Sequence, residues 1–289
     1  MQSDYIKNQI IDNFKSSFGI VASDNEWHVH PLRVVQATKS LIGTDLDTPS
    51  EKLLLWLQLY IEKNNFQKGP RFIKNVELRE VVSVKQLEES IINKNVVDSR
   101  ESLANLIKVS DGRPILEYML EMSLNQSGIS FLMIRSIIRS NIFMESKNIE
   151  PLLYDCLNVL LDFEFLETDI VENSKFLSDH IYIEVLLSLI AMDKEEFIRK
   201  DRFSNTIDCA KNKLRDISDT IKSNSFPINL SLCGRKGLVD FLNNSDVSII
   251  NPETVLFFDS IRSVLFANDD CDQFRLTCIV NNYLKGLKC

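Results

Sequence analysis

The sequence predicts an all-α fold, either an antiparallel helical bundle or an irregular HEAT-like array of about ten to thirteen helices. Glycine and proline are scarce, with eight and seven residues in a chain of 289. Sheet-rich folds need such residues in turns at short intervals, so their scarcity favours helices. Apolar residues also recur at steps of three and four along most of the chain, and the short connections between these segments favour antiparallel neighbours. No signature residues recur at a fixed period, so both architectures remain open.

The first half of the chain contains five segments with helical periodicity. Their predicted limits are 4–18, 32–42, 53–61, 85–93 and 98–109. Thr48, Pro49 and Glu51 precede the third segment with the spacing of a capping box, which predicts that Thr48 caps this helix. Asp98 is the predicted cap of the fifth helix. The stretch 76–84 has a mixed pattern and is expected to be irregular or a short helix.

The second half continues this pattern. Its predicted helices span 115–124, 129–143, 151–163, 175–192, 207–221, 254–267 and 271–284. Between them, residues 224–237 include serine, asparagine, proline and two glycines, so they form the longest expected linker. We therefore expect a main helical domain over 1–223 and a C-terminal helical unit over 224–289, packed on it or continuous with it.

The charge is concentrated in one stretch. Residues 148–193 contain ten acidic side chains and one base, Lys175, whereas the whole chain has a net charge of −8. Such a stretch predicts one strongly negative face, which repels nucleic acid and anionic membranes and attracts a basic or amphipathic partner. Around residue 165, acids alternate with apolar residues that would anchor such a partner. The expected partner-binding residues are Asp162, Glu164, Phe165, Glu167, Asp169 and Glu172.

This pattern makes a non-enzymatic scaffold or adaptor protein the leading functional hypothesis. A second possibility is an acidic inhibitor of a basic protein such as a toxin or nuclease. The acidic stretch would then cover the active cleft of its target. An ordinary connection between helices, with its aromatic rings facing the core, explains the same pattern without a partner.

Three histidines support an alternative hypothesis, a helical enzyme with a site in its core. His28 and His30 are two residues apart, so they reach one metal only from an extended segment, with a remote third ligand such as His180. The competing interpretation is a loop before a helix, in which Trp27 covers the edge of the core and both imidazoles are solvated. Because no helical ligand pair is present, we expect neither a metal nor another cofactor.

Other polar clusters have simpler explanations. Arg135 and Arg139 lie one turn apart on an otherwise apolar helix, where they either bind an acidic group or extend over the core. Asp269, Asp270 and Asp272 lack the spacing of a magnesium site and are expected to cap a helix. The six cysteines form no CxxC pair, the first residues have no apolar core of the kind that a signal peptide needs, and no apolar run reaches membrane length. We therefore expect a cytoplasmic protein with free thiols.

Overall fold

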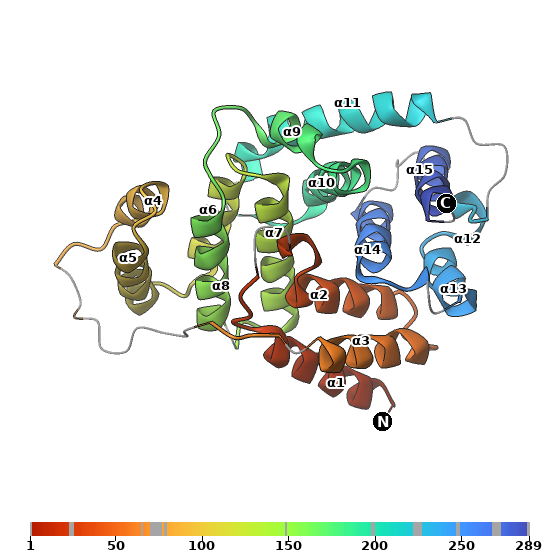
Figure 1. Ribbon diagram of the computed structural model, residues 1–289, viewed down its shortest axis with the longest axis horizontal. Coiled ribbons are helices and arrows are strands. Elements are labelled where there is room, and N and C mark those ends of the chain that lie inside the picture. The colour runs from red at the N-terminus through yellow and green to blue at the C-terminus, as the bar shows by residue number, and fades with distance from the viewer. Residues whose placement is uncertain are drawn as a thin grey trace.

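The all-α prediction is confirmed. The computed structural model of the chain is 75 % helix and contains no strand within the residues that it describes (Figure 1). These residues are 2–22, 26–64, 66–69, 77, 80–147, 149–197, 200–221, 227–246, 249–267 and 273–287. Fifteen α-helices lie within these ranges, slightly more than the ten to thirteen expected.

The helices of the first half are α1 (Gln2–Ser17), α2 (Pro31–Ile42), α3 (Glu51–Lys63), α4 (Val84–Ile92), α5 (Val96–Val109), α6 (Arg113–Ser123) and α7 (Gly128–Phe143). The helices of the second half are α8 (Ile149–Asp162), α9 (Ile170–Asn173), α10 (Asp179–Ala191), α11 (Ser204–Thr220), α12 (Leu230–Cys233), α13 (Lys236–Asn244), α14 (Pro252–Ala267) and α15 (Gln273–Gly286). Short 3₁₀ turns also occur, namely η1 (Trp27–Val29), η2 (Ser174–Phe176), η3 (Met192–Lys194) and η4 (Lys200–Arg202).

Two predicted helix caps are wrong by two or three residues. The cap of α3 is Ser50, whose hydroxyl accepts a hydrogen bond from the Leu53 amide at 3.2 Å. Thr48 lies before the helix, where its hydroxyl donates to Asp45. The cap of α5 is Asn95, and Asp98 supplies the amide that donates to it. In both cases a second polar residue near the helix start satisfies the capping geometry better.

The predicted linker is also partly wrong. Helix α12 forms inside 224–237, and α13 already begins at Lys236. A helix of four residues is a single turn, which is too short to show a periodic apolar pattern. The predicted boundary at 223/224 lies outside the described residues, as do Asp269, Asp270 and Asp272.

Helix α2 lies at the centre of the molecule. Eleven of its twelve residues are buried, and it packs against α1, α3, α7 and α14 (Figure 1). Helix α14 also packs against α10, so it connects the N-terminal helices to the middle of the chain. In a linear solenoid each repeat contacts only its neighbours. The contact between α2 and α14, which are far apart in sequence, is instead typical of a bundle.

One hydrophobic core includes residues from nearly every helix, among them Leu41 of α2, Ile134 of α7 and Phe258 of α14. Helices α4 and α5 lie at one end of the long axis, and α12, α13 and α15 lie at the other (Figure 1). None of the described helices combines the length and the apolar character that a bilayer crossing needs.

Candidate functional site

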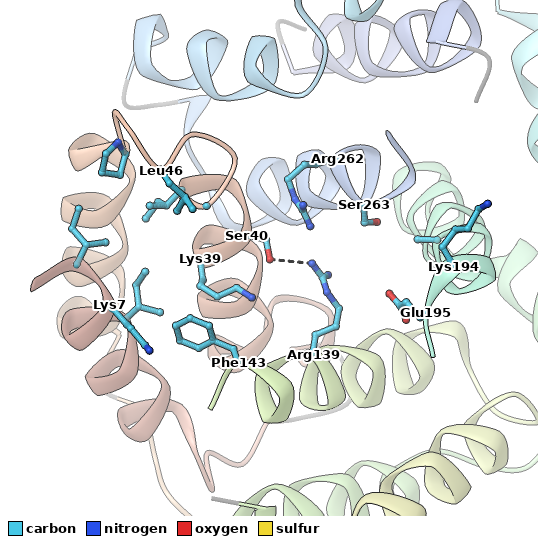
Figure 2. Close-up of a pocket in the computed structure, with 16 residues that line it drawn as sticks. Lys7, Lys39, Ser40, Leu46, Arg139, Phe143, Lys194, Glu195, Arg262 and Ser263 are labelled. Carbon is cyan, nitrogen blue, oxygen red and sulfur yellow. Dashed lines mark hydrogen bonds between the residues drawn. The ribbon is translucent and has the colours of Figure 1, made fainter. Parts of the chain in front are cut away.

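A cleft with a volume of about 500 Å³ lies between α1, α2, α7, α14 and the end of α10 (Figure 2). Most of one wall is apolar, because α1 and α2 turn their core-facing isoleucines toward it and Phe143 of α7 closes its floor. The apolar lining residues are Ile6, Ile10, Ile42, Leu46, Pro49, Phe143 and Ala191. This size and lining are typical of sites that hold a small organic ligand.

The other side of the cleft is cationic. Lys39 of α2, Arg139 of α7 and Arg262 of α14 point toward the same space, although they lie more than 200 residues apart at the extremes (Figure 2). The guanidinium of Arg139 donates to the Ser40 hydroxyl at 3.0 Å. Three cations that face one another repel, so this arrangement needs a compensating negative charge.

One buried carboxylate supplies part of that charge. Asp259 of α14 accepts two hydrogen bonds from Arg139, at 2.7 and 3.2 Å, and one from the Nε atom of Arg262 at 2.8 Å. Burial alone would raise the pKa of the Asp259 carboxyl, but the two guanidinium groups outweigh it and hold that pKa below its ordinary value. Asp259 therefore stays ionised and fixes both arginines at the edge of the cleft.

Lys39 has no such partner. No hydrogen bond or ion pair of its amino group is found within the described part of the chain, and the amine lies 4.9 Å from the centre of the Phe143 ring. Burial lowers the pKa of Lys39 to about 7, and the nearby charge of Arg139 adds to the effect. At neutral pH a large share of this amine is therefore uncharged.

A second layer of ion pairs supports the cleft. Arg33 of α2 pairs with Glu184 of α10, and Arg135 of α7 pairs with Glu195 after η3. With these pairs, the cluster has five basic side chains and three carboxylates. They are Arg33, Lys39, Arg135, Arg139, Arg262, Glu184, Glu195 and Asp259. Basic side chains therefore outnumber acidic ones in this cluster, whereas the whole chain has a net charge of −8.

The structure separates the three histidines. His30 is buried at the start of α2, where its Nδ1 accepts from the Leu32 amide and its Nε2 donates to the Ile20 carbonyl, both at 3.2 Å. Burial lowers its pKa to about 4, so the ring is neutral, and it stacks on Trp27. The expectation of a solvated imidazole is therefore wrong for His30, which has a structural role.

His28 and His180 instead approach the same carboxylate. Their Nε2 atoms lie 3.6 and 4.0 Å from the two carboxylate oxygens of Glu253, at the start of α14. Within the described ranges, no group of three histidine, cysteine or acidic side chains has the geometry of a metal site. The two imidazoles lie near Glu253, but they do not form the metal site that the spacing first suggested.

Several acids of the stretch 148–193 have partners inside the protein. Asp162 accepts from the Trp27 indole at 2.8 Å, and Asp169 caps α9. Glu172 pairs with Lys175, and Glu164 lies 3.9 Å from Lys94. Several of the acids that were expected to form a binding face therefore already have a partner inside the protein.

The apolar residues of this stretch are divided between the core and the surface. Ile170 and Val171 are fully buried, and Phe165 is half-buried against the core. Leu166 is 43 % exposed, and Phe176, which the sequence pattern did not single out, is 94 % exposed. The remaining expected contact residue, Glu167, lies on the surface.

No protein-family model, curated protein or solved structure matches this chain.

The sequence predicted only part of the cleft. The spacing of Arg135 and Arg139 indicated a possible acidic ligand, whereas Lys39 and Arg262 showed no such pair, because no other base lies within one turn of either residue. The one pattern that could have indicated Lys39 and Arg262 is a basic residue inside an apolar helical stripe.

Proposed function

We propose that the protein binds a small molecule that has one anionic group and an apolar portion, and that it does so in the cleft between α1, α2, α7 and α14. The observation that carries this proposal is the convergence of Lys39, Arg139 and Arg262 on a cleft with an apolar wall, where the buried carboxylate of Asp259 pairs with both arginines. A bound anion would supply the negative charge that the cluster lacks.

The donors needed for such an anion face the cleft. Arg262 uses its Nε atom for Asp259, and no hydrogen bond of its two terminal nitrogens is found among the described residues. Planar guanidinium groups bind carboxylate and phosphate groups through paired hydrogen bonds. The apolar wall formed by Ile6, Ile10 and Ile42 would then cover the rest of the ligand.

The mouth of the cleft suits capture of such a ligand. Leu46 is 74 % exposed at its rim, and the Lys7 side chain is 52 % exposed there. An exposed lysine attracts an anion at long range, and an exposed leucine offers apolar contact as the ligand enters.

Calorimetric titration of the full chain with sodium octanoate, octyl phosphate and 1-octanol tests this proposal. We expect both anions to bind with one site per chain and the neutral alcohol to bind at least about tenfold more weakly, because charged hydrogen bonds contribute about 1.5–3 kcal/mol. The two anions distinguish a carboxylate from a phosphate preference. Equal binding of all three compounds would contradict a role for the cationic side.

Arg262→Gln provides the matched variant. It removes a charge at the cleft but leaves Arg139 paired with Asp259. Its octanoate affinity should fall about tenfold or more. Lys15→Gln is the control, because Lys15 is an exposed lysine of α1 that does not line the cleft. If both variants bind octanoate as the parent does, the ligand does not use the cationic side and the proposal fails.

A second function, binding of a basic or amphipathic protein through the acidic stretch, is supported by the exposed side chains of Leu166 and Phe176. Glu164 and Glu167 lie on the surface in the same stretch. Such charges act mainly on the association rate. The adaptor hypothesis therefore remains a proposal about this surface, separate from the cleft.

A pull-down from extract of the native cell, with the parent and the Glu164→Gln/Glu167→Gln variant, tests this second proposal. The variant should recover less of its partners at low salt and a similar amount at moderate salt, because screening removes the contribution of surface charge. Phe176→Ser should weaken recovery at both salt concentrations. Equal recovery by the parent and both variants would show that the stretch is only a solvated surface.

A further inference from the structure

The cleft contains a lysine in an unusual position. Lys39 lies on the central helix α2 and extends over the Phe143 ring toward Arg139 (Figure 2). Lys39 is half-buried, and a lysine in such a place normally pairs with a carboxylate, but here the nearby carboxylate of Asp259 is held by two arginines. The position combines a low-polarity environment with neighbouring positive charge, the two conditions that make a lysine amine nucleophilic.

We propose that Lys39 forms a reversible imine with an oxo acid whose carboxylate is held by Arg139 and Arg262. The inference rests on the proposed function of the cleft and specifies its ligand class. In a 2-oxo acid the carboxylate and the carbonyl carbon are bonded directly to each other. A carboxylate held by the arginines therefore brings the carbonyl carbon to the space that Lys39 also faces.

The chemistry needs only the lysine and the ligand. The uncharged amine adds its electron pair to the carbonyl carbon, a C–N bond forms, and the product is a carbinolamine. The carbonyl oxygen then leaves as water with both amine hydrogens, and a C=N bond remains. The imine takes up one proton when it becomes an iminium, and water reverses the reaction.

The charged groups around Lys39 favour the uncharged amine. They come from α1, α7, α14 and the segment that follows α10, and they are Lys7, Arg139, Asp259, Arg262, Lys194 and Glu195. Burial and the two arginines lower the pKa of Lys39 to about 7, and only Asp259 acts in the opposite sense among the neighbours with a resolved effect. Lys7 and Lys194 are exposed lysines at the rim, which lack this environment.

Reductive trapping tests the imine. The full chain is incubated with 2-oxooctanoate and sodium cyanoborohydride, and the product is analysed by intact mass and peptide mapping. We expect one reduced adduct per chain on Lys39, formed about tenfold or more faster than on the other lysines, because an ordinary lysine amine is almost fully protonated at neutral pH. The trapping rate should rise with pH up to and through about 7, where Lys39 loses its proton.

Two variants and a competitor complete the experiment. Lys39→Arg keeps a long basic side chain but cannot form the imine, so the fast adduct should disappear, whereas Lys15→Arg should leave it unchanged. Octanoate should protect Lys39 in the parent, which tests the position of the adduct even if Lys39→Arg does not fold. Labelling spread evenly over the lysines, or a Lys39 adduct that octanoate does not suppress, would overturn the proposal.

The result also distinguishes the imine from the binding function. If 2-oxooctanoate competes with octanoate but no adduct forms, the cleft binds anions and the imine inference is wrong. If octanoate itself does not bind, the proposed function fails independently of any trapping result.

Discussion

Replacement of Asp259 by asparagine removes the one carboxylate that holds both Arg139 and Arg262, while it keeps the size of the side chain. Asp259 is 4 % exposed and accepts three hydrogen bonds at 2.7–3.2 Å. Removal of one partner from a buried ion pair leaves an uncompensated charge and costs about 3–5 kcal/mol. Two cations lose their partner here, so we expect a loss near the upper end of that range.

Urea unfolding at pH 7, followed by the helical circular dichroism signal, measures this loss. Asp12→Asn is the matched control, because Asp12 is an exposed acid of α1 whose pair with Lys15 spans 3.5 Å at the surface. Its effect should stay within about 0.5 kcal/mol. Octanoate should stabilise Asp259→Asn more than the parent, because its carboxylate replaces the missing charge. A loss of less than about 0.5 kcal/mol for Asp259→Asn would refute the electrostatic account of the cleft.

The same carboxylate predicts a dependence on pH. The pKa of Asp259 is lower in the folded protein than in the unfolded chain, so the unfolded chain takes up its proton first as the pH falls. The stabilisation by Asp259 is fully present above about pH 4 and is lost below that value. The difference in stability between the parent and Asp259→Asn should therefore be larger at pH 5 than in stronger acid, where it shrinks.

Three further predictions concern other parts of the molecule. The pKa of His30 is lowered to about 4, so between about pH 6.5 and pH 4 the unfolded chain binds a proton on His30 that the folded protein does not bind. His30→Gln should therefore flatten the loss of stability between pH 6.5 and pH 4 by up to about 3 kcal/mol, as measured by urea unfolding at several pH values. Gly128→Ala should destabilise by about 1–3 kcal/mol in thermal unfolding, because its methyl group would lie 2.6 Å from Val185 and 2.3 Å from Ser174. Elemental analysis of purified protein should find no stoichiometric zinc, iron or manganese, because His30 is held away from His28 and His180 by its backbone contacts.

Much of the fold could be predicted because helical periodicity is a local property. Segments such as 129–143 and 254–267 agree with α7 and α14 to within about two residues. The errors in the helix caps arose where more than one polar residue near the helix start could act as the cap. Ser50 rather than Thr48 caps α3, and nothing in the spacing ranks the two hydroxyls.

The cleft depends on tertiary packing, which local patterns do not contain. Lys39 and Arg262 meet only because α14 packs on α2. The acidic stretch was misjudged for the same reason. A count of charges cannot reveal that Asp162 accepts a hydrogen bond from Trp27, which lies in a distant segment. His30 illustrates both effects, since its place just before a helix was predicted from the local pattern, while its burial depended on the rest of the fold.

The packing of α14 on α2 also affects how the chain folds during synthesis. Helix α2 ends at Ile42 and α14 ends at Ala267, so a ribosome that adds about 5–20 residues per second needs roughly 10–45 s to make the second helix after the first. During that interval one apolar face of α2 has no partner, and a fragment that ends at residue 223 would keep that face uncovered. Nascent chains of this protein therefore keep an apolar surface that favours aggregation until α14 is made.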